Sequence, residues 1–210
     1  MGRIIRVLGI DPGINNTGYC LGLIDTETGI ITVKDYNVFS SSTVTKKKYK
    51  DDFKNFGSVV CHHYYSERIT DIIETLKPDY VVSEDAFINP RMPRAYGSLL
   101  LCISIIRNVL YRKFKKKLFT VAPKEAKRAV AEATADKLAI QESIHKLDDL
   151  VIKHTAQKPQ ETMCEHEADS VAILYAFCKK TLRSLIISEQ DDTPAIVESI
   201  EPPAKRKKKK

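Results

Sequence analysis

The residues with the clearest chemistry are acids that end predicted strands. Asp11 ends an apolar run that begins at residue 3, and Glu84 ends a second run that begins at residue 80. Because open α/β sheets place their ligand sites at the carboxyl ends of strands, both side chains are expected at one edge of a sheet. The alternative for either acid alone is a cap or turn residue, and Asp11, which begins Asp-Pro-Gly, suits a turn when it is taken by itself.

A third acidic group opens the last predicted helix, at Glu165-His166-Glu167-Ala168-Asp169. His166 and Asp169 are three residues apart and therefore share one helical face. Glu167 is expected to point elsewhere, into solvent. First-turn acids also favour the helix dipole. We keep that interpretation for Glu165 and Glu167, and we predict ligation by His166 and Asp169.

Carboxylates that converge in one place repel one another unless cations neutralise them. The predicted metal ligands are Asp11, Glu84, His166 and Asp169. Two metals roughly 3.5–4 Å apart can activate a water and stabilise a leaving 3′ oxygen, so phosphodiester hydrolysis is the predicted reaction. Mg²⁺ is the expected cofactor, with two ions per site, and Mn²⁺ would tolerate a histidine better. The alternative for His166 is to orient or deprotonate the water.

The elements that would position these residues form an α/β pattern with a mixed sheet, one half built from a hairpin and one half parallel. Residues 46–54 are expected to form a loop. The hydrophobic spacing predicts strands at 3–11, 18–24, 30–39, 80–84 and 118–121, and helices at 56–76, 94–113, from Pro123, at 136–150 and at 164–187.

The composition suits one folded domain. Of the 210 residues, 43% are hydrophobic, which is enough to bury a sizeable core. No run of 18 apolar residues predicts a transmembrane helix, and the first residues lack the layout of a signal peptide. The five cysteines are scattered, with no Cys-x-x-Cys pair, which disfavours a disulfide framework or a zinc ribbon and indicates a reduced, intracellular compartment.

The charge divides the chain into a folded domain at 1–187 and a predicted disordered acidic linker with a basic tail at 188–210. The tail segment holds six basic and five acidic residues, so +6 of the net charge of +7 belongs to residues 1–187. A basic body indicates an anionic partner, nucleic acid before membrane. The final Lys/Arg run could be a nuclear signal, a DNA-sliding arm or a solubilising segment.

Four motifs occur in order: Gly9-Ile-Asp-Pro-Gly13 with Asn16-Thr-Gly18, then Glu84-Asp-Ala-Phe87, then Ala122-Pro-Lys-Glu-Ala-Lys127, then His166-Glu-Ala-Asp169. Together, from about residue 4 to 185, they resemble the RuvC-type Holliday junction resolvases, with the closest likeness to the poxvirus branch. The resemblance implies an RNase H-like fold with a mixed central β-sheet flanked by helices. It also implies a homodimeric, Mg²⁺-dependent endonuclease that nicks a four-way DNA junction symmetrically.

The same resemblance implies a setting and a set of residue roles. The setting is DNA recombination and the resolution of viral genome concatemers in the host cytoplasm, with no membrane or small-molecule substrate. By motif position, Asp11, Glu84 and Asp169 resemble the catalytic acids of the family, and Lys127 resembles the lysine beside the scissile phosphate. His166 falls where some members carry Asp and some bacterial members carry His. Phe87 resembles an aromatic residue that wedges against an opened base, and its alternative is a core position.

Further basic residues are candidates for phosphate contacts. Lys137 resembles a second basic position of the family, and Lys124 and Arg128 flank Lys127. The alternative for all three is a solvated helix face. Two basic patches, Lys46–Lys50 and Arg91 and Arg94 with Arg112–Lys117, are further DNA candidates, for which affinity should fall steeply with salt. Part of the apolar segment 94–111 could form a dimer interface.

Three other functions fit parts of the sequence. An actin-like ATP-binding fold shares Gly-Ile-Asp-x-Gly, but it needs a duplicated domain and a second phosphate loop, for which the chain has no room. A catalytically inactive junction-binding protein would gain nothing from a repelling carboxylate cluster. Another RNase H-like nuclease, acting on RNA/DNA hybrids or plain duplex, is disfavoured only by the Phe87 and Lys127 motifs.

Overall fold

The fold is known from a computed structural model that describes residues 2–87, 93–132, 136–153, 163–182 and 184, without the side chains at 43–46, 93 and 94. The predicted tail at 188–210 and Arg91 lie outside the described residues. Six strands form one sheet in the order β5-β4-β1-β2-β3-β6. The strands are β1 (Ile4–Asp11), β2 (Thr17–Asp25), β3 (Ile31–Phe39), β4 (Tyr80–Glu84), β5 (Leu118–Val121) and β6 (Leu150–Ile152).

The sheet is mixed, as predicted. Strands β1, β2 and β3 are antiparallel neighbours, whereas β4 is parallel to β1, β5 is parallel to β4 and β6 is parallel to β3. Gly29 closes the β2–β3 hairpin with a φ of 74°, a left-handed conformation that favours glycine. The hairpin half and the parallel half meet at β1, which is therefore central.

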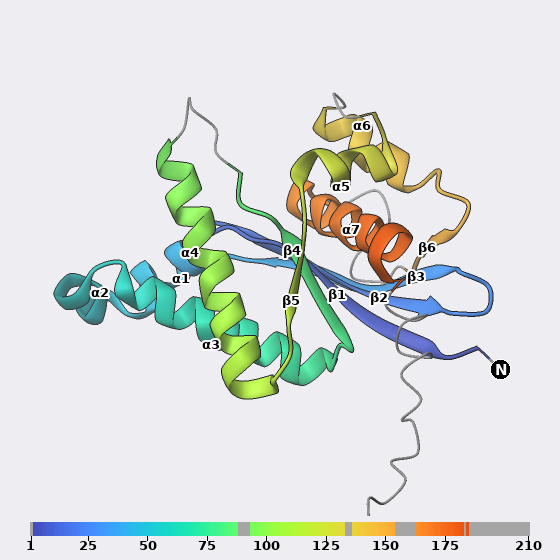
Figure 1. The fold of residues 1–210 in the computed structure, drawn as a ribbon. Coiled ribbons are helices and arrows are strands. Elements are labelled where there is room, and N and C mark those ends of the chain that lie inside the picture. Colours follow the sequence, from blue (N-terminus) through green and yellow to red (C-terminus); the bar gives the residue numbers. More distant parts are fainter. Residues whose placement is uncertain (1, 88–92, 133–135, 154–162, 183, 185–210) are drawn as a thin grey trace, which may run out of the picture.

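Helices cover both faces of the sheet (Figure 1). One face packs on α7 (Glu165–Phe177), with α5 (Pro123–Val130) and α6 (Lys137–Ile144) above it. The other face packs on α3 (Val59–Leu76) and α4 (Pro93–Val109). Alternation along β1 accounts for the two cores, since Ile5 and Val7 face α7 while Leu8 and Ile10 face α3 and α4.

Two local predictions are wrong. Residues 46–54 are helical, because α1 (Ser41–Lys48) and α2 (Lys50–Phe56) occupy the expected loop. The predicted helix at 136–150 ends at Ile144, and Leu150 begins the short strand β6 instead. These elements are held by tertiary contacts, which the local hydrophobic pattern does not predict. Helices α1 and α2 lie against α3, and β6 pairs with β3.

Helices α4 and α7 end in wider turns. A π-helical turn at Leu110–Phe114 follows α4, and another at Cys178–Leu182 follows α7. Each α-helix together with its π-helical turn covers most of the corresponding predicted helix, at 94–113 and at 164–187. None of the helices in the described part of the chain is long and apolar enough to span a lipid bilayer.

Candidate active site

Asp11 and Glu84 end two adjacent parallel strands at the same edge of the sheet. Ile10 is in register with Ser83, so the acid that follows each of them lies one residue further along its strand. Val7 and Val82 belong to the core under α7, and the period of two places Asp11 and Glu84 on that same face. The fold therefore brings both predicted acids under the first turns of α7.

Helix α7 reaches these acids because three strand residues have no side chain. A Cβ on Gly18 would lie 1.9 Å from the carbonyl oxygen of His166, and one on Gly9 would lie 2.5 Å from the carbonyl oxygen of Ser170. Gly22 lies under the side chain of Leu174 in the same way. The glycines let the helix backbone touch the sheet, which fixes the first turn of α7 over the end of β1.

His166 pairs directly with Asp11. The His166 Nδ1 atom lies 2.8 Å from Asp11 Oδ2. This hydrogen bond raises the pKa of His166, partly opposed by burial, and the neighbouring charges of Asp11, Glu165 and Asp169 add to the increase. The pair orients the imidazole ring, so the other ring nitrogen, Nε2, is the one that can take or give a proton.

The pKa values of Glu84 and Asp169 are both raised by burial and by the charge of Asp11. Burial, followed by the charges of Asp11 and Asp169, raises the pKa of Glu84 to about 8. Burial, followed by the charges of Asp11 and Glu165, raises the pKa of Asp169 to about 6. Lys127, in α5, lowers both pKa values. Three carboxylates thus share one half-buried neighbourhood with one opposing lysine.

This donor set fits a divalent cation in its chemistry. A cation would stabilise the charged form of these half-buried carboxylates, whose pKa values are raised despite Lys127, and carboxylate oxygens are the ligands that Mg²⁺ prefers. Within the described residues, however, no three His, Cys, Asp or Glu side chains are arranged so that they could hold a metal ion. Asp11 Oδ2 is instead hydrogen-bonded to Nδ1 of His166.

Glu167 corrects the prediction of a solvated side chain. It is only 4% exposed, and its Oε2 accepts a hydrogen bond of 2.9 Å from the backbone N–H of Cys164. This bond is half of a capping box, in which the cysteine side chain accepts from the backbone of Glu167. The missed signal was the spacing of three between the N-cap and a Glu, hidden because Cys164 is an unusual cap.

The other predicted site residues lie around the acids in different ways. Lys124 and Arg128 are exposed on α5, beside the half-buried Lys127. Lys137, at the start of α6, is exposed and pairs with Glu165. Phe87 follows β4 and is 49% exposed, so the core alternative for this residue is wrong.

The raised pKa of Glu84 predicts how the metal-free protein responds to pH. Between its ordinary value of 4.5 and about 8, the folded state holds a proton that the unfolded state releases. The free energy of unfolding should therefore fall as pH rises through this range, by up to about 1.4 kcal/mol per pH unit. Chemical denaturation in EDTA measures this slope.

Glu84→Gln provides the comparison, because an amide does not titrate. The variant should lose most of the slope and be more stable than the wild type near the upper end of the range. Mg²⁺ should stabilise the wild type at high pH and the variant much less. Equal slopes for the two proteins would show that Glu84 is not held in this protonated, buried state.

Comparisons with known proteins place this geometry in context. No family model matches the sequence. A crossover junction endodeoxyribonuclease RuvC from Caldicellulosiruptor saccharolyticus is 28% identical over 194 residues, which cover 90% of this chain and 99% of that protein.

Two solved structures show the same fold. RuvC from T. thermophilus, in complex with a Holliday junction substrate, matches 82% of this chain and 92% of its own with a TM-score of 0.61 and 18% identity. The fowlpox virus Holliday junction resolvase matches 86% of this chain and 99% of its own with a TM-score of 0.50 and 14% identity. The expected special closeness to the poxvirus branch gains little support, since the bacterial fold matches better. The chain has the RNase H-like fold of the Holliday junction resolvases and resembles a bacterial RuvC in sequence over almost its whole length.

Proposed function

We propose that the protein is a structure-specific endonuclease that resolves four-way DNA junctions by metal-dependent phosphodiester hydrolysis. The observation that carries the proposal is the electrostatic cluster of Asp11, Glu84 and Asp169, with Lys127 as its opposing cation, at the sheet edge of a resolvase fold. The similarity to a bacterial RuvC supports the choice of substrate.

The residues divide the chemistry among them. Asp11, Glu84 and Asp169 would hold Mg²⁺, which when bound supplies a Lewis acid and a more acidic water. Lys127, whose charge lowers the pKa of Glu84 and of Asp169, would neutralise a phosphate that approaches the acids. Asp11 orients His166 through Nδ1, and His166 can then move a proton at Nε2 or serve as a further ligand. Lys124 and Arg128, exposed on the same helix as Lys127, would contact neighbouring phosphates.

A panel of labelled DNA substrates tests the proposal. Four-way, Y-shaped and linear duplex DNA are incubated with the protein in Mg²⁺, Mn²⁺ or EDTA. Nicks in opposing strands of the four-way junction are expected with either metal and are not expected in EDTA. If the protein binds the four-way junction tightly but nicks it in none of the buffers, it is an inactive junction-binding protein. Equal cleavage of linear duplex or of RNA/DNA hybrids would identify another kind of nuclease.

The exposed aromatic after β4 gives a separate prediction. Phe87→Ala should reduce junction cleavage by about tenfold or more, because base–aromatic stacking contributes about 1–3 kcal/mol. Thermal stability should hardly change, since the ring is half-exposed. Phe87→Tyr, which keeps the ring, should retain most of the activity. A fall in melting temperature without a loss of cleavage would assign Phe87 a packing role.

We also propose a homodimer formed through α4. Two nicks related by the two-fold axis of a junction need two active sites related in the same way. Helix α4 supports this proposal with the exposed side chains of Leu100 and Leu101, which are 40% and 38% exposed. The pair of substitutions Leu100→Asp and Leu101→Asp should convert a dimer into a monomer in light-scattering measurements. A wild-type monomer, or a dimer that survives both substitutions, would contradict this interface.

The biological setting belongs to the same proposal. Recombination and the resolution of concatemeric viral DNA in a host cytoplasm are supported by the motif order and by the fold shared with the fowlpox resolvase. The test is to express the protein in cells infected with a virus whose own resolvase is deleted. Restored resolution of the concatemers is the expected result. Complementation only of a bacterial resolvase defect would exclude the viral setting.

A further inference from the structure

The end of the sheet opposite the candidate active site carries a second feature. Strand β5 is parallel to β4, so its first residue, Leu118, lies at the end of the sheet away from Glu84. Helix α4 begins at Pro93 and runs to that far end, where the π-helical turn that follows it leads into β5 (Figure 1). Three residues of β5, at about 3.3 Å per residue, separate Leu118 from Val121, the partner of Glu84, by about 10 Å.

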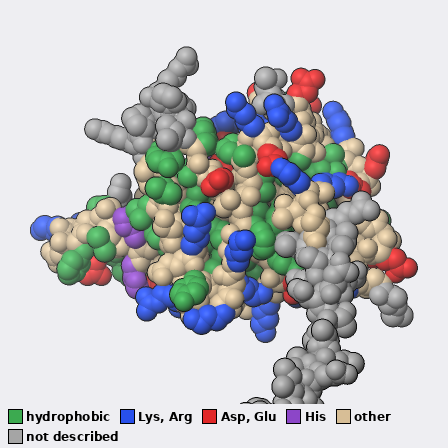
Figure 2. Space-filling model, viewed as in Figure 1, with side chains coloured by type: hydrophobic (Ala, Val, Ile, Leu, Met, Phe, Trp, Pro, Cys, Tyr) green, Lys and Arg blue, Asp and Glu red, His purple; other side chains and the backbone are tan. Residues whose placement is uncertain are grey.

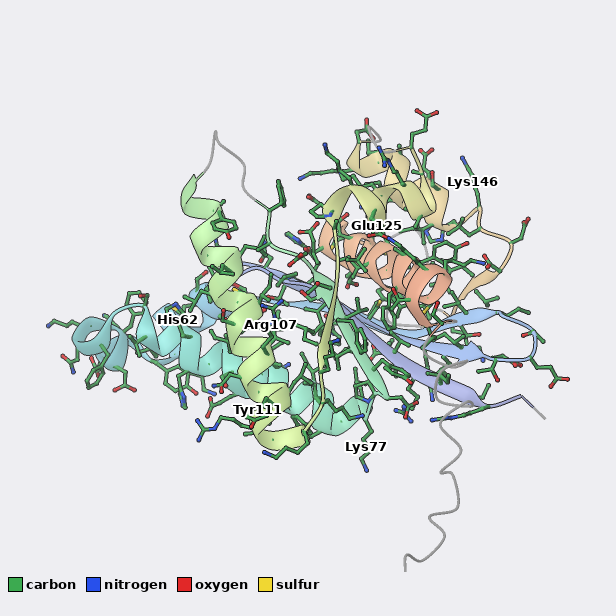
Figure 3. All side chains as sticks on the ribbon, viewed as in Figure 1. His62, Lys77, Arg107, Tyr111, Glu125 and Lys146 are labelled. Carbon is green, nitrogen blue, oxygen red and sulfur yellow. The ribbon has the colours of Figure 1, made fainter. Side chains whose placement is uncertain are left out.

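Basic side chains gather at this far end, around one exposed tyrosine. We call the set the distal basic rim, and all of its members are exposed: Lys77, Arg107, Arg112, Lys113, Lys115 and Lys117. Among the described residues, none of the six forms an ion pair with a carboxylate. Tyr111, which lines one depression with Arg107, Lys115 and Lys117, is 69% exposed. Figure 2 shows Lys and Arg side chains around the lower ends of α3 and α4, and Figure 3 labels Lys77, Arg107 and Tyr111 there.

The rim is built on a fixed backbone. The Nζ of Lys116 donates hydrogen bonds to the carbonyl oxygens of Pro78, at 2.7 Å, and Asp79, at 3.0 Å, which ties the β5 turn to the turn before β4. Lys77 and Lys115 follow the ends of α3 and of the π-helical turn, with φ values of 45° and 54°. They are the two non-glycine residues with positive φ in the described part of the chain. Glycine is the usual residue at such positions, so backbone geometry does not explain a lysine at both.

The surface beside the π-helical turn is hollowed, and the charged residues that line this hollow are all basic. A depression of about 590 Å³ is lined by Arg107, Tyr111, Lys115, Lys116, Lys117 and Leu118. Four of these six residues are cationic and none is acidic. The neighbouring depression, which includes Lys77, also contains the acids Glu74 and Asp79. The Nζ of Lys115 lies 4.8 Å from the centre of the Tyr111 ring, which holds the lysine at the rim of the depression.

We infer that the distal basic rim binds the phosphate backbone of a duplex DNA segment other than the one held at the candidate active site. Unpaired, exposed cations around a shallow depression match a regular polyanion, and duplex DNA carries one charge per about 1.7 Å of its axis. Tyr111 alone offers too little apolar area for insertion into a membrane surface. The helix dipole favours cations at these helix ends by about 0.3–1 kcal/mol each, which is the competing structural explanation.

This inference goes beyond the proposed function. The rim begins at the start of β5, about 10 Å along the strand from Val121, the partner of Glu84, so it does not contact the phosphate that is cut. The rim shares with the proposed function only the premise that the protein acts on DNA. Binding of linear duplex and nicking of a junction are separate measurements, so failure of the rim and failure of the nuclease are distinguishable.

The test compares two full-length triple variants that each remove three positive charges. The rim variant is Lys77→Gly/Lys115→Gly/Lys117→Gln, in which glycine suits the left-handed backbone at two positions. The control variant neutralises three exposed lysines elsewhere, Lys34→Gln/Lys54→Gln/Lys146→Gln. Affinity for a linear duplex of about 30 base pairs is measured in EDTA over a series of salt concentrations.

The rim variant should bind the duplex about tenfold or more weakly, and the slope of log affinity against log salt should fall by about 2 to 3. The control variant should change both quantities much less. The melting temperature of the rim variant should stay the same or rise, and its nicking of a short-armed four-way junction should stay within about twofold of the wild type.

Three results would overturn the inference. Unchanged duplex affinity in the rim variant would show that the cations only stabilise the helix ends, and a lower melting temperature of the variant would support that role. Equal losses in the two triple variants would show a general charge effect. Binding to phosphatidylserine vesicles that exceeds duplex binding and disappears in the rim variant would assign the rim to a membrane surface.

Discussion

Glu84→Gln is expected to abolish DNA cleavage while the protein still binds four-way junctions. Single-turnover nicking should fall by about 10³-fold or more, because the substitution removes one of the three acids that we propose to hold Mg²⁺. Asp11→Asn and Asp169→Asn should have the same effect, since the pKa of Glu84 is raised by both charges. Binding should persist or tighten, because each amide removes a negative charge that repels phosphate.

Glu165→Gln is the matched control for these variants. Glu165 lies in the first turn of the same helix as Asp169, but its side chain pairs with Lys137. Its loss should leave most of the nicking activity. If Glu165→Gln were as inactive as Asp169→Asn, the cluster would extend further than the three acids. If Glu84→Gln nicked at the wild-type rate, Glu84 would have no part in the mechanism.

Gly18→Ala is expected to damage both the fold and the activity. The added Cβ would lie 1.9 Å from the carbonyl oxygen of His166, which is backbone and has little room to move. Overpacking of this kind costs about 1–3 kcal/mol, and a backbone partner favours the upper part of that range. The start of α7 would shift away from β1, so the His166–Asp11 pair would separate and nicking would fall steeply. Urea denaturation and single-turnover nicking measure the two effects.

Gly97→Ala provides the control for Gly18→Ala. Gly97 lies in α4 with nothing within 4 Å of an added Cβ, so alanine should stabilise the helix by about 0.5–1 kcal/mol. Activity should be retained. A Gly18→Ala protein as stable and active as Gly97→Ala would mean that α7 does not rest on the sheet as described.

Several parts of the fold were readable from local patterns. The apolar runs that end at Asp11 and Glu84 became adjacent parallel strands, because alternation and the order of elements determine both the face and the edge of each acid. The hairpin with Gly29 at its turn is equally local. The α/β interpretation with a mixed sheet was therefore confirmed from patterns that span fewer than ten residues each.

Other parts depend on contacts between distant segments. Strand β6 has three residues, too few for a visible period, and exists because Ile31 and Val33 of β3 offer an edge. Glu167 is buried by a cap whose Cys164 is not among the usual capping residues. The close approach of α7 depends on Gly18 and Gly22 of β2 lying two residues to either side of Cys20, the partner of Gly9 on β1, and only strand pairing reveals this arrangement.

The basic run at Arg112–Lys117 was also predictable only in part from the sequence. Its charge was visible in the sequence and suggested DNA contacts, but its distance from the acids depends on the direction of β5 relative to β4. Nothing in the sequence indicates that Lys77 belongs with this run, because Lys77 is 35 positions before Arg112. The hydrogen bonds of Lys116 to Pro78 and Asp79 hold the two segments together.

The most direct test of the central claim is to map cleavage positions on a four-way junction whose strands are labelled one at a time. Wild-type protein in Mg²⁺ or Mn²⁺ should nick two opposing strands at equivalent positions, and neither EDTA samples nor the Glu84→Gln variant should nick at all. Nicks by Glu84→Gln at the wild-type rate, or equal cleavage of linear duplex by the wild type, would contradict a junction resolvase built on Asp11, Glu84 and Asp169.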